Sequence, residues 1–402
     1  MKSKRMRVFA AGAAVVAIGI CAQKGFSGST ILPKNDAVGI SVEKGAKWLV
    51  SVQGKDGGWG QDGGETSYVR RGENLESNGN DVANTAVAAE ALLHAGRNAT
   101  NGEYRVAVQR AVDFILRHIE ESPNDGLSVT NLNGTQIQRK LGPYIDTFLS
   151  SKLLAEIDGN MGDARLNARV RRDLQKCVVK IEKNQLKDGS WNVAGGWAPI
   201  LGTSMASRSL YIAQQKGVAV DTLTMAKVED YTQKAGQAGS PGGVAGGIVG
   251  GIPRDVGSGG FGAAIAASPV AVASAGVALY QQAQALEQLS RTEADRKKNA
   301  QQIKAISGEL SNARFVAGFG SIGGEEFFSY LNISDSLHRT GGPEWAKWNG
   351  DMKIKLIRLQ NDDGTWAGQH CITGRVAVTS AAILLLMADR DPVTVPVSAR
   401  KN

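Results

Sequence analysis

A few residues of this chain combine reactive chemistry with a position where it could be used, near the starts of apolar helical segments. Carboxyl groups can act as general acids and bases, so the catalytic candidates are the four acids Asp81, Asp146, Glu325 and Glu326. A guanidinium binds a carboxylate or phosphate through two parallel hydrogen bonds. The ligand-binding candidates are therefore Arg375 and its neighbour His370.

The elements that must position these residues are helices. Apolar periodicity predicts helices almost throughout from residue 39 onward, without a run of alternating strand pattern. One kind has a single wet face, and it is predicted at 39–53, 104–120, 164–185, 221–235, 292–306 and 345–359. The other kind is apolar nearly all round, which indicates burial on every side. It is predicted at 82–94, 144–156, 203–215, 268–287, 325–338 and 375–389.

Strict alternation of the two kinds predicts an all-α fold, an (α/α)6 toroid with an outer and an inner ring of helices. An open helical solenoid is the alternative, because the sequence does not show whether the two ends meet. In a toroid the N-termini of the inner helices gather at one mouth and carry partial positive charge. The acids there either cap amides and offset the helix dipoles, or form a polar rim above an apolar ligand cavity.

A signature of the form Gln-x-x-Asp-Gly-x-Trp occurs three times and makes this a repeat protein. The copies are Gln53/Asp56/Gly57/Trp59, Gln185/Asp188/Gly189/Trp191 and Gln360/Asp363/Gly364/Trp366. We interpret each copy as structural: the Gln bonds free carbonyls where its outer helix ends, Asp-Gly forms a turn, and the Trp folds back. A Thr follows each copy near the start of an inner helix, where we expect it to cap free amides (Thr85, Thr203 and Thr379).

At these residues the chain resembles the prenyltransferase and squalene-cyclase repeat superfamily, whose repeats carry Gln-x-x-x-Gly-x-Trp between an outer and an inner helix. Lys44 and Gly45 extend the match in the first copy. The resemblance implies an α/α toroid with a central cavity over about residues 39–389. Its members include triterpene cyclases, protein prenyltransferases and thioester-containing complement-like domains.

The catalytic signatures of those enzymes are missing. No Asp-x-Asp-Asp string occurs, and the aromatic residues that would line a carbocation cavity make up only 6% of the chain. The zinc-binding Asp-x-Cys pair of prenyltransferases is absent from the segment that opens with Gly323, and so is the Cys-Gly-Glu-Gln thioester string. The adjacent His370 and Cys371 are too few for a zinc site. We therefore predict no metal and no cofactor. We interpret His94 as an ordinary packing or surface residue.

The first 30 residues have the layout of an export signal: Lys and Arg precede an apolar run at 8–22. We expect a periplasmic or extracellular protein, cleaved near Ala22. The alternatives are an uncleaved membrane anchor through residues 8–22 and a lipid on Cys21. Without residues 1–30 the chain has 41 basic and 38 acidic residues. Because the basic residues are scattered, no nucleic-acid partner is expected.

The predicted domain organisation is a signal peptide or anchor at 1–30, the toroid at 31–390 and a disordered tail at 391–402. Residues 236–262 contain 12 glycines and are predicted to form a long loop, either a lid or a solvated insertion. The favoured function is a binding or scaffold protein whose cavity, at the inner-helix mouth, takes a lipid-like, peptide or glycan ligand. The alternative is a divergent enzyme of isoprenoid or polysaccharide metabolism.

Overall fold

The computed structural model describes residues 36–62, 79–96, 98–192, 199–238, 282–310, 312, 323–369 and 371–390. Over these residues the regular structure is helical, and the strand-like pairing consists of one isolated bridge between Trp59 and Asp81. No helix among the described residues has the length and apolar character needed to cross a bilayer. The predicted signal segment and the C-terminal tail lie outside the described residues.

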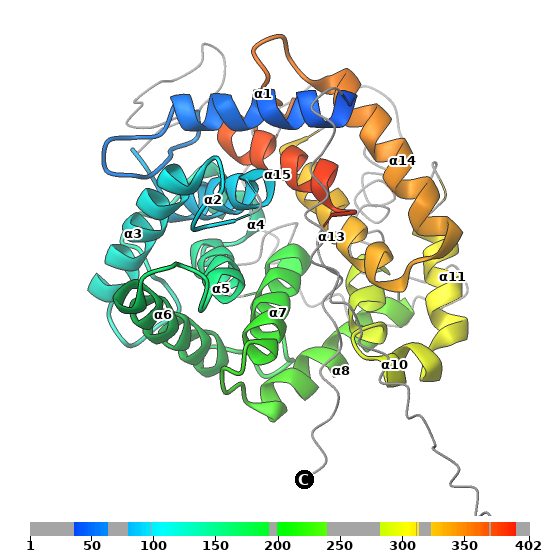
Figure 1. Cartoon of the computed structure of the whole chain (residues 1–402). Coiled ribbons are helices and arrows are strands. Elements are labelled where there is room, and N and C mark those ends of the chain that lie inside the picture. Colours follow the sequence, from blue (N-terminus) through cyan, green and yellow to red (C-terminus); the bar gives the residue numbers. More distant parts are fainter. Residues whose placement is uncertain are drawn as a thin grey trace, which may run out of the picture.

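The outer ring follows the predicted amphipathic segments closely (Figure 1). Its helices are α1 (Ala37–Ser51), α3 (Arg105–Glu121), α6 (Ala164–Lys183), α8 (Thr222–Ala238), α10 (Glu293–Lys298) with α11 (Ala300–Leu310), and α14 (Gly342–Leu359). Only Trp348, Met352 and Leu356 are buried in α14, and they lie four residues apart on one face. This confirms a helix with one wet face.

The inner ring consists of helices that are buried nearly all round. They are α2 (Val82–Gly96), α5 (Ile145–Ile157), α7 (Pro199–Gln215), a helix at 282–289, α13 (Gly324–Thr340) and α15 (Arg375–Met387). In α5 every residue except Glu156 is buried. Residues 268–281 of the predicted fourth inner helix lie outside the described part of the chain.

The ring is closed. The last inner helix, α15, packs against the first inner helix, α2, and α14 packs against α1. Figure 1 shows the same closure, with α1 lying beside both α14 and α15. The toroid prediction is confirmed, and the open solenoid is excluded because the first and last helix pairs are in contact.

The three tryptophans of the motif seal the joint between each outer helix and the chain that leaves it. Trp59, Trp191 and Trp366 are at most 3% exposed. Each indole N–H donates to a carbonyl ten residues earlier in the preceding outer helix, at 2.7–2.8 Å. The predicted fold-back of the indole is therefore confirmed.

The motif glutamines connect one outer helix to the next, which differs from the expected cap on their own helix. Each Nε2 donates to the carbonyl of the motif glycine and to a carbonyl near the start of the following outer helix. The second acceptors, all at 2.9 Å, are Ala107 of α3, Thr224 of α8 and Ser41 of α1. Because Ser41 and Gln360 are 319 residues apart, the third copy fastens the seam of the ring.

The motif aspartates differ from the glycines and tryptophans of the same motif, because they lie at the surface and not inside the joint. Asp56, Asp188 and Asp363 are all exposed. One carboxylate oxygen of each accepts the backbone N–H two residues later, at 2.9–3.0 Å. This is the local bond by which an aspartate stabilises a turn, so the predicted turn is confirmed. Asp56 and Asp188 hold it from the solvent side, where water can solvate the charge that burial would penalise.

The motif glycines allow a close approach to the next outer helix. Gly57, Gly189 and Gly364 have φ values of 95°, 91° and 87°, which favour glycine. A Cβ added at Gly189 would lie 2.2 Å from the carbonyl oxygen of Lys227 in α8, and at Gly364 it would meet Lys44 of α1. The following threonines also differ from expectation: Thr85, Thr203 and Thr379 accept the backbone N–H of the motif Trp at 2.9–3.1 Å, so they join turn to helix.

Three local features differ from the predicted segments. The short helix α4 (Gln136–Leu141) begins at a capping box made by Thr135 and Gln138. The fifth outer helix is divided between α10 and α11 at Asn299. Residues 236–238 of the predicted glycine-rich loop belong to α8, and the rest of that loop lies outside the described residues.

Candidate functional site: a charged cluster inside the inner ring

Asp81, at the N-terminal end of the inner ring, is a helix cap. It is 2% exposed, and its two carboxylate oxygens accept hydrogen bonds from the backbone N–H and the side-chain amide of Asn84. Burial raises the pKa of Asp81 to about 7, and repulsion from Asp146 adds to that effect. Because its oxygens are already bonded inside the protein, Asp81 has the structural role of a capping acid.

Asp146 ties two inner helices together at the same end. It is 1% exposed, and it accepts from the Ala83 backbone N–H of α2 at 3.0 Å and from the Gln138 amide at 2.7 Å. Burial raises its pKa to about 6. The starts of α2 and α5 therefore lie side by side, which places their N-termini at one mouth.

Glu325 and Glu326 are buried in the first turn of α13, at 0% and 4% exposed. Tyr330 donates its hydroxyl to Glu326 at 3.2 Å. Burial, and then a hydrogen bond to Glu325, raises the pKa of the Cys371 thiol to about 11. Glu325 thus lies beside Cys371 in the loop before α15, whereas Glu326 bonds within α13 and attracts Lys355 of α14.

Arg375, the predicted ligand anchor, is engaged by protein carboxylates. Its guanidinium lies 3.3 Å from Asp62 and 3.2 Å from Asp363, and its backbone N–H also donates to Asp62. The same guanidinium stacks over the Trp48 ring at 5.2 Å. These contacts fasten α15 to the third motif copy and to α1. His370 lies outside the described residues.

The structure instead brings charged side chains together in the C-terminal halves of the inner helices. Lys152 of α5 bonds Glu90 of α2 and, at 2.8 Å, Glu156 of its own helix. His94 of α2 lies 3.1 Å from the other oxygen of Glu156. Side-chain exposure rises from 4% at Glu90 through 10% at Lys152 to 20% at Glu156. The group is therefore buried at Glu90 and reaches solvent near the C-terminal ends of α2 and α5.

The two carboxyl groups around Lys152 are electrostatically unlike. Burial raises the pKa of Glu90, and this outweighs the opposing attraction of Lys152. For Glu156, burial is outweighed by Lys152 and His94, and the pKa is lowered. Burial also opposes the charge of Lys152, but Glu156 and Glu90 raise its pKa above the usual value. Glu156 and Lys152 are therefore a charged pair, and of the two carboxyl groups Glu90 is the one whose protonated form burial favours.

Glu90, His94 and Glu156 are also the residue types that bind transition metals, and their ligand atoms lie within 4.8 Å of one another. The ammonium of Lys152, however, is bonded to both carboxylates and takes the position a cation would need. The donor set suits a metal, but the arrangement around it suits an internal lysine.

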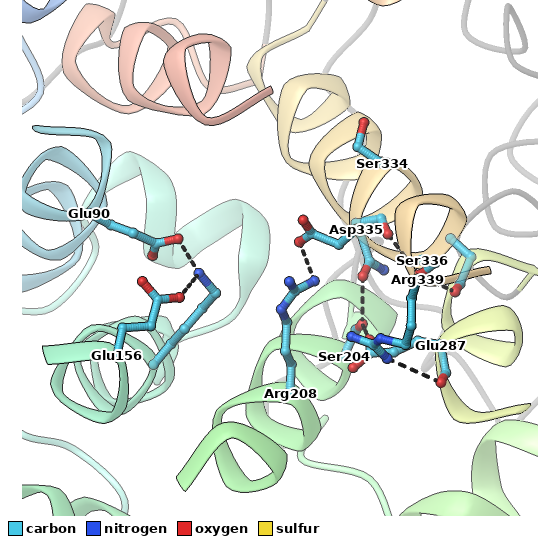
Figure 2. Close-up of polar contacts among 12 residues, drawn as sticks. Glu90, Glu156, Ser204, Arg208, Glu287, Ser334, Asp335, Ser336 and Arg339 are labelled. Atoms are coloured by element: carbon cyan, nitrogen blue, oxygen red, sulfur yellow. Dashed lines mark hydrogen bonds and ion pairs between the residues drawn. The ribbon is translucent and has the colours of Figure 1, made fainter. Parts of the chain in front are cut away.

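A second group of polar side chains joins the inner helices α7 and α13. Arg208 of α7 pairs with Asp335 of α13, and Ser204 of α7 lies 3.3 Å from Asn332 of α13 (Figure 2). Burial opposes the charge of Arg208, but Asp335 and Glu287, and then Glu90 and Glu156, raise its pKa above the usual value. The two parts of the cluster are thus close enough to interact. We call all of these residues the inner-ring cluster: Glu90, His94, Lys152, Glu156, Arg208, Asp335, Asn332, Glu287, Arg291 and Arg339.

The last three members meet around Tyr211 of α7. The guanidiniums of Arg291 and Arg339 stack over its ring at 4.9 and 5.7 Å, and its hydroxyl donates to the Arg291 carbonyl at 3.0 Å. Arg339 also donates to the Glu287 carbonyl at 3.4 Å. Three inner elements, α7, 282–291 and α13, are held together here by polar contacts.

The spacing of charged residues in two inner helices is a signal in the sequence for this cluster. Composition alone does not distinguish these helices from other buried helices. Glu90 with His94, and Lys152 with Glu156, are spaced four residues apart, so each pair shares one helix face. Both pairs fall in segments that are buried nearly all round. The structure gives His94 a specific partner, Glu156 on the neighbouring inner helix, which the expectation of an ordinary packing or surface residue did not include.

The fold and this site together define an all-α toroid with a charged interior. Residues 29–137 match the family model of the squalene-hopene cyclase C-terminal domain. The matched segment contains α1, α2, α3 and the first motif copy. This match supports the resemblance to the squalene-cyclase and prenyltransferase superfamily over residues 29–137. A comparison with curated proteins and one with solved structures found no match.

Proposed function

We propose that this protein is an exported binding protein whose inner ring takes a polar ligand of peptide or glycan type. The observation that carries the proposal is the inner-ring cluster, in which charged side chains from α2, α5, α7, residues 282–291 and α13 converge. An isoprenoid chain placed against these groups would desolvate them without giving a hydrogen bond in return, which costs several kcal/mol for charged groups.

The proposal moves the ligand from the N-terminal mouth to the C-terminal halves of the inner helices. At the N-terminal mouth, Asp81 and Asp146 already accept hydrogen bonds from backbone and side-chain amides of the protein. At the other end, Lys152 and Glu156 keep 10% and 20% of their side-chain exposure, so solvent reaches the charges there. Ligand specificity requires a few polar groups that point to one place, and these residues supply them.

The test is to identify what the mature protein carries and what stabilises it. Native mass spectrometry of the purified protein, followed by extraction, should find a polar molecule, and thermal melting should rise with members of a soluble peptide and oligosaccharide panel. Farnesol and geranylgeraniol should give no rise. A co-purifying isoprenoid, or stabilisation by the prenols alone, would refute the proposal.

A polysaccharide-degrading enzyme is the second candidate, and one observation favours it. Glu90 and Glu156 face each other with pKa values moved in opposite directions, as a general acid and a charged carboxylate require. Lys152 lies between them and would have to leave for a sugar to enter. Release of reducing sugar from acidic or neutral polysaccharides, abolished by Glu90→Gln but retained by the exposed Glu103→Gln, would favour this candidate over simple binding.

Export is part of the proposal and rests on the basic and apolar layout of residues 2–22. Expression with and without residues 1–30, followed by cell fractionation and N-terminal sequencing, decides it. A full-length protein recovered in the cytoplasm with an intact N-terminus would remove export from the proposal.

A further inference from the structure

Three arginines of the inner-ring cluster come from three different elements and surround one place. Arg208 lies on α7, Arg291 follows the helix at 282–289, and Arg339 lies near the end of α13. Arg291 and Arg339 share the face of Tyr211. Burial lowers the pKa of Arg339, and repulsion from Arg208 and Arg291 adds to that effect against the attraction of Glu287. The three guanidiniums are therefore electrostatic neighbours.

These arginines have hydrogen-bond donors that the protein leaves unused. The Nε atoms of Arg208, Arg291 and Arg339 are buried without an acceptor, and so is Nδ2 of Asn332. Arg291 and Asn332 are only 7% and 8% exposed. A buried donor without an acceptor costs about 1–3 kcal/mol, and more when the donor is charged. Several such donors in one place are expected to have an acceptor in the functional state.

The acceptors nearby do not satisfy them. One oxygen of Glu287 has no hydrogen bond, and it lies 3.7 Å from the Arg291 guanidinium, beyond hydrogen-bond distance. A rotation of Glu287 would serve one donor and leave the other three unchanged. Asp335 already pairs with Arg208 through a different nitrogen. These buried N–H donors therefore require an acceptor that Glu287 and Asp335 do not supply.

The charges indicate which acceptor fits. The three arginines lie among carboxylates: Glu287 and Asp335 pair with them, and Glu229, Glu90 and Glu156 also attract them electrostatically. Among these carboxylates, a singly charged acceptor is repelled less than a doubly charged phosphate. Planar carboxylates also match the fork of guanidinium N–H groups. Arg208 and Asp335 keep 16% and 11% of their side-chain exposure, so the place is not sealed from solvent.

We propose that Arg208, Arg291, Arg339 and Asn332 form a carboxylate-binding site, and that the carboxylate is the group by which the ligand of the inner ring is recognised. This inference rests on the proposed binding function and specifies it. Figure 2 shows Arg208 of α7 extending toward Asp335 of α13, and Arg339 of α13 lying beside Ser204 and Glu287. Peptides and acidic sugars both supply carboxylates, so the two sources are separate arms of the test.

The experiment is calorimetric titration of the mature protein at constant ionic strength. The probes are N-acetylalanine for a peptide carboxylate, glucuronate for an acidic sugar, glucose and N-acetylalanine amide as uncharged partners, and inorganic phosphate. At least one carboxylate probe should bind in preference to its uncharged partner and to phosphate. Arg339→Leu should weaken that binding by about tenfold or more, while Arg358→Leu, which removes an exposed charge on α14, should leave it unchanged.

Arg339→Lys is the second variant, since it keeps the charge and loses the fork; circular dichroism checks that each variant is folded. Equal binding by wild type, Arg339→Lys and Arg339→Leu would overturn the carboxylate site but leave the proposed function intact if polar ligands still bind. Preference for phosphate, or binding of no carboxylate probe, would also overturn the site. Binding of prenols in place of every polar probe would remove the proposed function as well.

Discussion

Trp366→Ala tests whether the third motif copy holds the ring closed. Trp366 is completely buried, and its indole N–H donates to the Leu356 carbonyl at 2.8 Å. The indole lies against α1 so closely that a Cβ added at Gly45 would be 3.0 Å from it. Truncation removes this contact and leaves a cavity between α14, α1 and α15. We expect a loss of roughly 3–5 kcal/mol in the free energy of unfolding, of which about 1 kcal/mol belongs to the hydrogen bond.

The assay is urea unfolding followed by circular dichroism. Trp366→Phe separates the hydrogen bond from the packing, and it should lose less than the alanine variant. Trp345→Ala is the matched control, because Trp345 is partly exposed and stacks on His338 at 4.8 Å at the edge of α14. If Trp366→Ala cost less than about 1 kcal/mol, or no more than the Trp345 control, the idea that the motif indoles lock the helices would be wrong.

Three further predictions concern the motif turn, the N-terminal acids and Lys152. Gly364→Ala should destabilise by roughly 1–3 kcal/mol more than Gly217→Ala, because both glycines have positive φ but only Gly364 meets a neighbouring helix. Stability should fall as the pH rises from about 4 to about 7, since the folded state holds protons on Asp81 and Asp146 more tightly than the unfolded state. For Asp81 this effect is roughly 4 kcal/mol at most, and Asp81→Asn should flatten the profile. Lys152→Met should cost about 3–5 kcal/mol by leaving Glu90 without its cation and Glu156 with His94 alone.

Each of these has a direct check. Equal melting temperatures for the two glycine variants would show that the approach of α1 to Gly364 is unimportant. Denaturant unfolding across the pH range reads out the acids, and an unaltered slope in Asp81→Asn would contradict the assignment. For Lys152→Met, adding Glu90→Gln should restore part of the loss, because the buried negative charge is then removed; a double variant no more stable than the single one would contradict the pairing.

Much of the architecture is predictable because its causes are local. A wet face in the segment from Trp345 to Leu359, and its absence in residues 144–156, distinguish outer from inner helices by hydrophobicity alone. The positive φ of Gly57, Gly189 and Gly364 follows from the Asp-Gly turn. The roles of Gln360 and Thr379 were mistaken, because their partners lie on the next outer helix and on the motif Trp, which local pattern does not identify.

The site was less predictable for the same reason. Asp81 and Asp146 were predicted as site residues because they lie at helix starts. There their carboxylates accept backbone N–H groups of α2. Glu90 and Lys152 lie in two helical segments and are 62 residues apart. The local sequence of neither segment predicts that these two residues pair. Arg375 has a charge suited to an anionic ligand, but its guanidinium already pairs with Asp62 and Asp363.

The sequence by itself determined the helices, their alternation and the three indole-bearing turns, since these depend on periodicity and on the backbone freedom of glycine. Only the tertiary structure decided that the ring closes between α14 and α1, and which charges meet inside it. The physical reason is that hydrophobic patterning fixes which face of a helix is buried, whereas ion pairs depend on distances between helices that are far apart in the chain.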